Sequence, residues 1–138
     1  MVTEYAKPIP TPTVDTQEFW DSVRRHHMAI QRCDQCGSFR WPPNRACPEC
    51  MSFESTWALV SGRGKVYTFI LMHQLYHQGF ASELPYPVAI VELEEGPRLV
   101  TNIVGCPIDQ LRCDMPVELV YEDIGEEATL YKFRPVPR

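Results

Sequence analysis

The sequence lacks a long apolar run. No stretch of its 138 residues approaches the roughly 20 consecutive apolar residues that a helix needs to cross a bilayer. The first residues, MVTEYAKPIPTPT, also lack the basic start and apolar core of a secretory signal. From these two absences we expect a cytoplasmic protein, in which thiols stay reduced and paired cysteines more often bind metal than each other.

The short motifs that mark common active sites are also missing. The chain contains no glycine-rich phosphate loop, no nucleophile elbow and no Ser/His/Asp arrangement. The segment SGRGK combines glycine with basic residues, but its setting indicates a loop that enters a strand. Nothing in the sequence requires the chain to be an enzyme, and we predict no catalytic residue.

Positive charge is in the minority, since 13 Lys and Arg against 18 Asp and Glu give a net charge of -5. Residues 83–127 hold eleven acids and only two bases, Arg98 and Arg112. Nucleic-acid binding depends on neutralising phosphates with Lys and Arg, so this acidity argues against it. Residues 21–50 are more basic, with three acids against five arginines: Arg24, Arg25, Arg32, Arg40 and Arg45.

Proline is abundant at the N-terminus, where it indicates an extended arm over residues 1–14. The following DTQEFWDSVRRHH predicts a short helix, with Asp15 as its cap and Glu18 completing a capping box. Phe19, Trp20 and Val23 would form its apolar side. A helix this short must pack on something, either the rest of the chain or a partner. The next segment, HMAIQR, predicts a strand that leads into a cysteine-rich module.

The region after residue 50 is strand-like, rich in Val, Ile, Tyr, Phe and Thr, with Gly or Pro between the pieces. Five or six short strands in about 80 residues, without helical periodicity between them, predict a small closed barrel or sandwich. The candidate strands are TWALV, GKVYTFILMHQ, YPVAIVELE, PRLVTNIV, PVELVYE and ATLYKFRP.

Four of the six cysteines lie in RCDQCGSFRWPPNRACPEC, as two C-x-x-C pairs separated by ten residues. Two such turns can direct four sulfurs at one point, which suits tetrahedral zinc. Zinc is therefore our expectation for Cys33, Cys36, Cys47 and Cys50, with iron or disulfides as alternatives. Four thiolates would leave no open coordination position, so the metal would be structural. No βαβ pattern supports a thioredoxin-like redox pair.

The remaining cysteines and two histidines carry weaker signals. Cys106 and Cys113 are each expected to be small buried hydrophobic residues rather than nucleophiles. His73 and His77 lie four apart, but the surrounding sequence indicates a strand end and a loop, which argues against a second metal site. A hydrogen-bonding or ligand-lining role stays open for both.

In its order of motifs the chain resembles domain-of-unknown-function family 35. The resemblance covers about residues 15–136 and follows the capped helix, CDQCGSFRWPPNRACPEC, SGRGKVYTF, LPYPVAIVELEEGPRLVTNIVG, MPVELVYED and KFRPV. It implies a mainly β chain, with an N-terminal helix, a rubredoxin-like zinc ribbon and a five- or six-stranded OB-fold barrel. The corresponding ranges are an arm at 1–14, the helix and lead-in strand at 15–32, the ribbon at 33–55 and the barrel at 56–138.

The resemblance also implies a function. Family members are similar to non-catalytic accessory subunits of thiolase-fold enzymes that act on acyl-CoA thioesters, including thiolases, hydroxymethylglutaryl-CoA synthase and lipid-transfer-protein-like aldolases of steroid side-chain breakdown. It implies a hetero-oligomer, structural Zn²⁺ on the four paired cysteines, and a contribution to a CoA-binding surface or channel. Candidate residues for CoA contact are Arg24, Arg25, Trp41, Arg63, Lys65 and His73.

Two other functions stay open at this point. The first is a stand-alone acyl-CoA-binding protein or small enzyme using Cys106 or His73. The second is a nucleic-acid-binding protein, because zinc ribbons and OB-folds both bind nucleic acid, although an OB-fold reader needs a basic groove.

Overall fold

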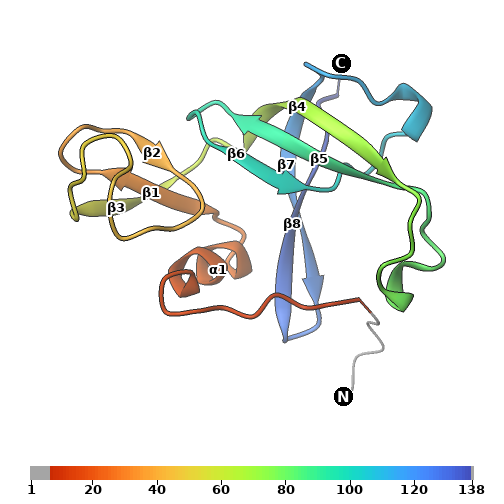
Figure 1. Cartoon of the computed structure of the whole chain (residues 1–138), viewed down its shortest axis with the longest axis horizontal. Helices are drawn as coiled ribbons and strands as arrows, with labels where there is room; N and C mark the ends of the chain where they lie inside the picture. The colour runs from red at the N-terminus through yellow and green to blue at the C-terminus, as the bar shows by residue number, and fades with distance from the viewer. Residues whose placement is uncertain (1–6, 138) are drawn as a thin grey trace.

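The computed structural model describes residues 7–137 and consists of a small sheet, one α-helix and a larger curled sheet (Figure 1). The α-helix is α1 (Gln17–Arg24). The small sheet contains β1 (Ala29–Cys33), β2 (Phe39–Arg40) and β3 (Ser55–Leu59). The larger sheet contains β4 (Arg63–Met72), β5 (Tyr86–Leu93), β6 (Arg98–Thr101), β7 (Pro116–Ile124) and β8 (Ala128–Pro135). Short 3₁₀ turns lie at Gln78–Phe80 and Ile108–Gln110.

The larger sheet has the strand order β6-β5-β4-β7-β8, and all of its neighbours are antiparallel. It curls because the chain after β6 returns to β8. Ile103 forms a parallel bridge with Phe133, and the Val104 N–H donates to the Phe133 carbonyl at 2.8 Å. This confirms the predicted mainly β fold with an OB-like barrel, and the sheet has five strands.

One strand belongs to a different sheet from the one that its sequence pattern suggested. The segment TWALV was grouped with the barrel strands, but β3 pairs along its length with β1, in the order β2-β1-β3. Strand composition alone does not identify a partner strand. Here the lead-in strand β1 offers a free edge that β3 covers in antiparallel register, from Ala29 opposite Leu59 to Cys33 opposite Ser55.

Helix α1 packs between the two sheets, on the chain's own core. Phe19 is 1% exposed, and its ring makes edge contacts with Trp41 near the small sheet and Tyr131 on β8. Val23 is fully buried, as predicted, whereas Trp20 is only partly buried. A single apolar core therefore runs from Ile30 in the small sheet through the helix into the barrel.

The predicted capping box of α1 is wrong. The N-cap is Thr16, and no side chain caps the free backbone N–H groups. A local turn explains the difference, because the Thr13 N–H donates to Thr16 Oγ1 at 2.8 Å. The carboxylate of Asp15 accepts from Arg45 instead, and Glu18 pairs with Arg25.

The N-terminal arm has no helix or strand over residues 7–13, and residues 1–6 of the predicted arm lie outside the described part of the chain. Figure 1 shows the arm running from α1 past β7 and β8 towards the β4–β5 connection. Lys7 forms an ion pair there with Glu83 at 2.9 Å and lies over the Phe80 ring. No helix among the described residues has the length and apolar character needed to span a membrane.

Candidate metal centre

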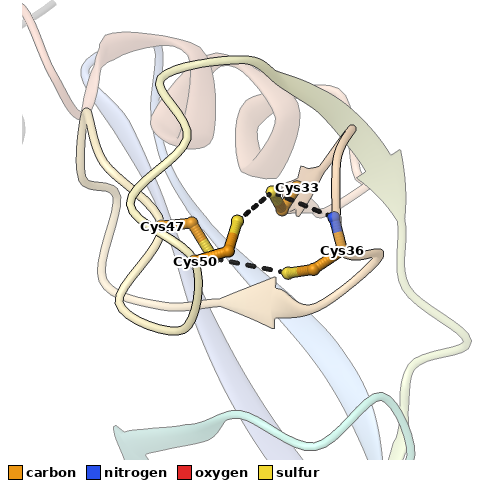
Figure 2. A group of neighbouring side chains, drawn as sticks. All are labelled: Cys33, Cys36, Cys47 and Cys50. Atoms are coloured by element: carbon orange, nitrogen blue, oxygen red, sulfur yellow. Dashed lines mark hydrogen bonds between the residues drawn. The ribbon is translucent and has the colours of Figure 1, made fainter.

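The two C-x-x-C turns bring four cysteine sulfurs to one point, as Figure 2 shows. The four sulfur atoms all lie within 4.8 Å of one another. The Cys33 and Cys50 sulfurs are 3.5 Å apart, and those of Cys36 and Cys47 are 3.6 Å apart. Zinc bound tetrahedrally by thiolates at about 2.3 Å requires sulfurs roughly 3.8 Å apart, so this arrangement fits the metal.

Each turn is closed by the same pair of backbone hydrogen bonds. In the first, the Cys33 N–H donates to the Ser38 carbonyl and the Gly37 N–H donates to the Cys33 carbonyl. The second repeats this pattern with Cys47, Met51 and Ser52. The two turns are therefore copies of one another, and each presents its first cysteine from a buried position.

Backbone N–H groups also point at the sulfurs. The Cys36 N–H donates to Cys33 Sγ at 3.5 Å, and the Glu49 N–H donates to Cys47 Sγ at 3.4 Å. Such bonds favour the thiolate, which is the form that binds metal. The turn geometry therefore prepares the sulfurs for a cation.

The pKa shifts of the thiols differ in direction across the centre. Bonding to Cys36 N–H lowers the pKa of Cys33, and bonding to the Ser38 side chain and backbone lowers the pKa of Cys36 to about 6. The backbone of Ser52 also lowers the pKa of Cys50, but burial and the three neighbouring cysteines together raise it to about 12. Adding the last negative charge beside the others is unfavourable, and a divalent cation removes that cost.

Three features of this centre were missed in the sequence. Met51 has φ of +69°, the left-handed conformation that Gly37 adopts at φ +78° in the first turn. The closing residues Ser38 and Ser52 were also overlooked. All of them belong to a local repeat, Cys-x-x-Cys-x-Ser, which is visible as CDQCGS and CPECMS. Recognising that repeat would have predicted both turns in full.

The two other cysteines lie away from the centre. Cys106 is partly buried, and its thiol donates to the Pro107 carbonyl at 3.4 Å. Cys113 is exposed, so the expectation that it is a buried hydrophobic residue is wrong. It lies in the turn that enters β7, where the chain runs over the surface. No disulfide joins any of the six cysteines, and the paired sulfurs of the centre, at 3.5 and 3.6 Å, are too far apart for an S–S bond of about 2.05 Å.

The six residues predicted to contact CoA do not form one cluster. Arg24 donates to the Gly125 and Ala128 carbonyls at the β7–β8 turn, and Arg25 pairs with Glu18. The Trp41 ring packs on Phe19 and Tyr131. These contacts hold the three side chains within the fold. That any of the three contacts CoA stays a prediction.

Arg63 and Lys65 do lie together, at the start of β4, lining a hollow of about 490 Å³. Acidic residues share this hollow, and Lys65 lies 3.8 Å from both Glu92 and Asp114. His73 is exposed, in the connection that follows the other end of β4. In the same connection, His77 accepts a hydrogen bond from the Gly79 N–H at 3.0 Å.

Two family models match successive parts of the chain. Residues 20–55 match the rubredoxin-like zinc ribbon domain of ChsH2, and residues 57–122 match its C-terminal OB-fold domain. Together with the sulfur geometry, the match to a zinc ribbon supports structural zinc as the metal of this centre.

Three relatives are similar over most of this chain. A probable enoyl-CoA hydratase alpha subunit of Thermomonospora curvata is 40% identical over 94% of this chain, which spans only 40% of that protein. A benzoylsuccinyl-CoA thiolase subunit, BbsA, of Thauera aromatica is 30% identical over 82% of this chain and 79% of its own length. A DUF35 domain-containing scaffold protein of Methanocaldococcus jannaschii is 34% identical over 85% of this chain and 88% of its own length.

A solved structure extends these similarities to the fold. A chain of the Ltp2-ChsH2(DUF35) aldolase superposes with a TM-score of 0.83 and 40% identity, covering 91% of this chain and 98% of that one. The ribbon, the barrel and the scaffold-protein relative all lead to the same conclusion: the chain belongs to the DUF35 family.

Proposed function

We propose that this chain is a non-catalytic accessory subunit that binds and stabilises a thiolase-fold enzyme acting on acyl-CoA thioesters. The observation that carries this proposal is the match to nearly the whole of one chain in an aldolase structure. Relatives that are named as subunits of a CoA thiolase and of a CoA-ester hydratase support it. The partner would perform thiolytic or retro-aldol cleavage, with steroid or lipid side chains as candidate substrates.

The metal centre supports a structural rather than a catalytic role. We assign the zinc to Cys33, Cys36, Cys47 and Cys50, whose four thiolates would fill a tetrahedral site. A catalytic zinc keeps one position for water or substrate. The metal here would supply folding energy to the ribbon, and the reaction would belong to the partner.

The barrel offers a surface on which such a partner could dock. On the outer face of β4, β5 and β6, register places Ile90 beside Val100 and Ile70 beside Val88, with side chains pointing away from the core. Ile70 and Val100 are each 55% exposed. A contiguous exposed apolar surface of this kind is typical of an interaction site.

The charged border of this apolar face would orient a partner. At the ribbon-facing end of β4 and β5, Glu92 lies between Lys65 and Arg98, at 3.8 and 3.7 Å. Arg98 also stacks on Tyr67 at 3.7 Å from the ring centre. An apolar centre with a polar rim is the usual composition of a protein interface.

The test is affinity capture with the tagged chain from lysate of its source organism, followed by mass spectrometry. We expect a thiolase-fold protein in near-stoichiometric amount. Charge substitutions Ile70→Lys and Val100→Lys should reduce its recovery at least about tenfold, since a buried unpaired charge costs several kcal/mol. Glu126→Lys, at the exposed β7–β8 turn, is the matched control. Recovery of a lone zinc-loaded chain would contradict the accessory role.

A stand-alone acyl-CoA-binding protein is the second candidate, favoured by the hollow beside Arg63 and Lys65. Calorimetric titration of the isolated chain with CoA separates the two functions. Tight binding that Lys65→Ala and Arg63→Ala weaken would favour independent binding. Absence of heat with the isolated chain, alongside capture of a thiolase-fold protein, would favour the accessory subunit.

A further inference from the structure

Arg40 is a buried cation without a carboxylate partner. Its side chain is 5% exposed, and no ion pair of Arg40 occurs among the described residues. Nε and Nη2 donate to neutral oxygens, Gln31 Oε1 and the Asn44 carbonyl, and buried Nη1 has no hydrogen-bond partner. A guanidinium removed from water in this way is costly unless a negative charge lies nearby.

The part of the chain that contains Arg40 also contains the two buried cysteines of the candidate metal centre. Within residues 31–59, all of which the structure describes, just three residues are buried: Cys33, Arg40 and Cys47. Two of the three are proposed zinc ligands. After the buried apolar residues Ala29 and Ile30 at the start of β1, the buried residues of the ribbon are thus two cysteines and this arginine.

Strand register places Arg40 on the side of the sheet that carries the first cysteine. Arg40 pairs with Gln31 across β1 and β2, and Gln31 and Cys33 are two residues apart on β1. Their side chains therefore point to the same face, about 7 Å apart along the strand. On its other side, Arg40 holds the carbonyl of Asn44, three residues before Cys47, at 2.8 Å. Arg40 thus joins Gln31 on β1 to the loop that leads into the second cysteine turn.

Zinc bound by four thiolates carries a net charge of -2. The two N–H bonds to Cys33 and Cys47 sulfurs provide only partial compensation. A full positive charge on the same buried face would stabilise this dianion, because charges in a poorly solvated region interact strongly.

We propose that the guanidinium of Arg40 is the counter-charge of the zinc–thiolate centre. The metal centre takes the place of the missing carboxylate, and each buried ion stabilises the other. Zinc affinity and the burial of Arg40 are then thermodynamically coupled.

A purely positional role is the alternative reading of the same contacts. Gln31 Oε1 also accepts from the Asn44 N–H at 2.7 Å, so Arg40, Gln31 and Asn44 together tie the loop between the cysteine turns to β1. Charge and position are separable by substitution. Arg40→Gln removes the charge and keeps a hydrogen-bond donor. Arg40→Lys keeps the charge but lacks the planar set of N–H donors of the guanidinium group.

The experiment measures the zinc dissociation constant of the full chain by competition with a chromophoric chelator. We expect Arg40→Gln to raise this constant about tenfold or more, and Arg40→Lys to stay within about threefold of the unsubstituted chain. The control is Arg32→Gln, because Arg32 is exposed beside the first turn, where solvent screens its charge. It should leave zinc affinity within about twofold.

Urea denaturation with and without zinc provides a second readout. Arg40→Gln should lower the midpoint of the zinc-loaded chain but not that of the zinc-free chain, in which the substitution removes an uncompensated buried charge. If Arg40→Gln gives no folded protein, Arg40→Met serves as the neutral variant. Unchanged zinc affinity in the neutral variant would overturn the proposal. Equal losses in the neutral and lysine variants, or in Arg32→Gln, would overturn it too.

Discussion

The ribbon and the barrel of this chain are stabilised in different ways. In the barrel, large apolar side chains such as Val66, Leu99, Val117 and Phe133 are fully buried in one contiguous core. In the ribbon, the buried residues between 31 and 59 are two cysteines and an arginine. A module this small cannot bury enough apolar surface to offset its conformational entropy, so it needs a metal. The comparison predicts that loss of zinc unfolds the ribbon, whereas loss of a buried apolar side chain destabilises the barrel.

The largest effect is expected from removing a metal ligand. Cys33→Ser should reduce zinc content from about one ion per chain to near none and unfold the ribbon, since structural zinc contributes most of the folding free energy of such modules. Partner capture should weaken with it. Metal analysis and circular dichroism measure the change. Cys113→Ser, at an exposed cysteine outside the centre, is the control and should keep its zinc. Full zinc content in Cys33→Ser would refute the ligand assignment.

A cavity in the barrel core should lower the stability of the fold and leave the zinc content unchanged. Phe133→Ala removes a fully buried ring and should cost about 3–5 kcal/mol of unfolding free energy, measured by urea denaturation. Zinc content should be unchanged because the ribbon's metal is held by other residues. Ile70→Ala, on the exposed face, should change stability by no more than about 0.5 kcal/mol. Loss of zinc in Phe133→Ala would show that the two regions fold as one unit.

A smaller loss of stability is expected from substitutions at equivalent positions of the two cysteine turns. Gly37→Ala should destabilise the zinc-loaded chain by about 1 kcal/mol, because a Cβ is strained at φ +78°. The added atom itself would be 3.7 Å from the nearest Arg32 atom, so the cost is backbone strain alone. Met51→Ala, at the equivalent position, should be nearly neutral, since Met51 already has a Cβ and is 71% exposed. Equal costs at both positions would argue against the repeat.

The smallest effect concerns the contact between helix and barrel. A hydrogen bond from Thr129 and another from His26 lower the pKa of Asp123 below its usual 3.8. A lowered folded-state pKa stabilises the protein above pH 3.8, and this contribution is lost as the pH falls through the folded value. Asp123→Asn should therefore flatten the acid side of a plot of urea midpoint against pH. An unchanged acid slope in that variant would mean that Asp123 does not stabilise the fold.

The local patterns of the sequence were sufficient for most of the elements. Alternating β-branched and aromatic residues identified β4 to β8, because each strand must present one face to the core. The two C-x-x-C pairs were sufficient for a four-sulfur centre, since two residues between cysteines set the direction of both sulfurs. The capping box failed because a turn at Thr13 and Thr16 competed for the same helix end.

The pairing of strands and the burial of individual side chains could be learned only from the tertiary structure. The composition of β3 fits either sheet, and only pairing with β1 decided which one it joins, because β-propensity describes a strand and not its neighbour. In the sequence, Arg40 is one of five arginines in a basic region, and nothing distinguishes it from the others. In the structure, it is the one among the five that is buried. Burial arises where distant segments meet, so no local pattern marks it. For this protein, the sequence determined most of the strands and the cluster of four cysteine sulfurs, and the fold decided which arginine is buried.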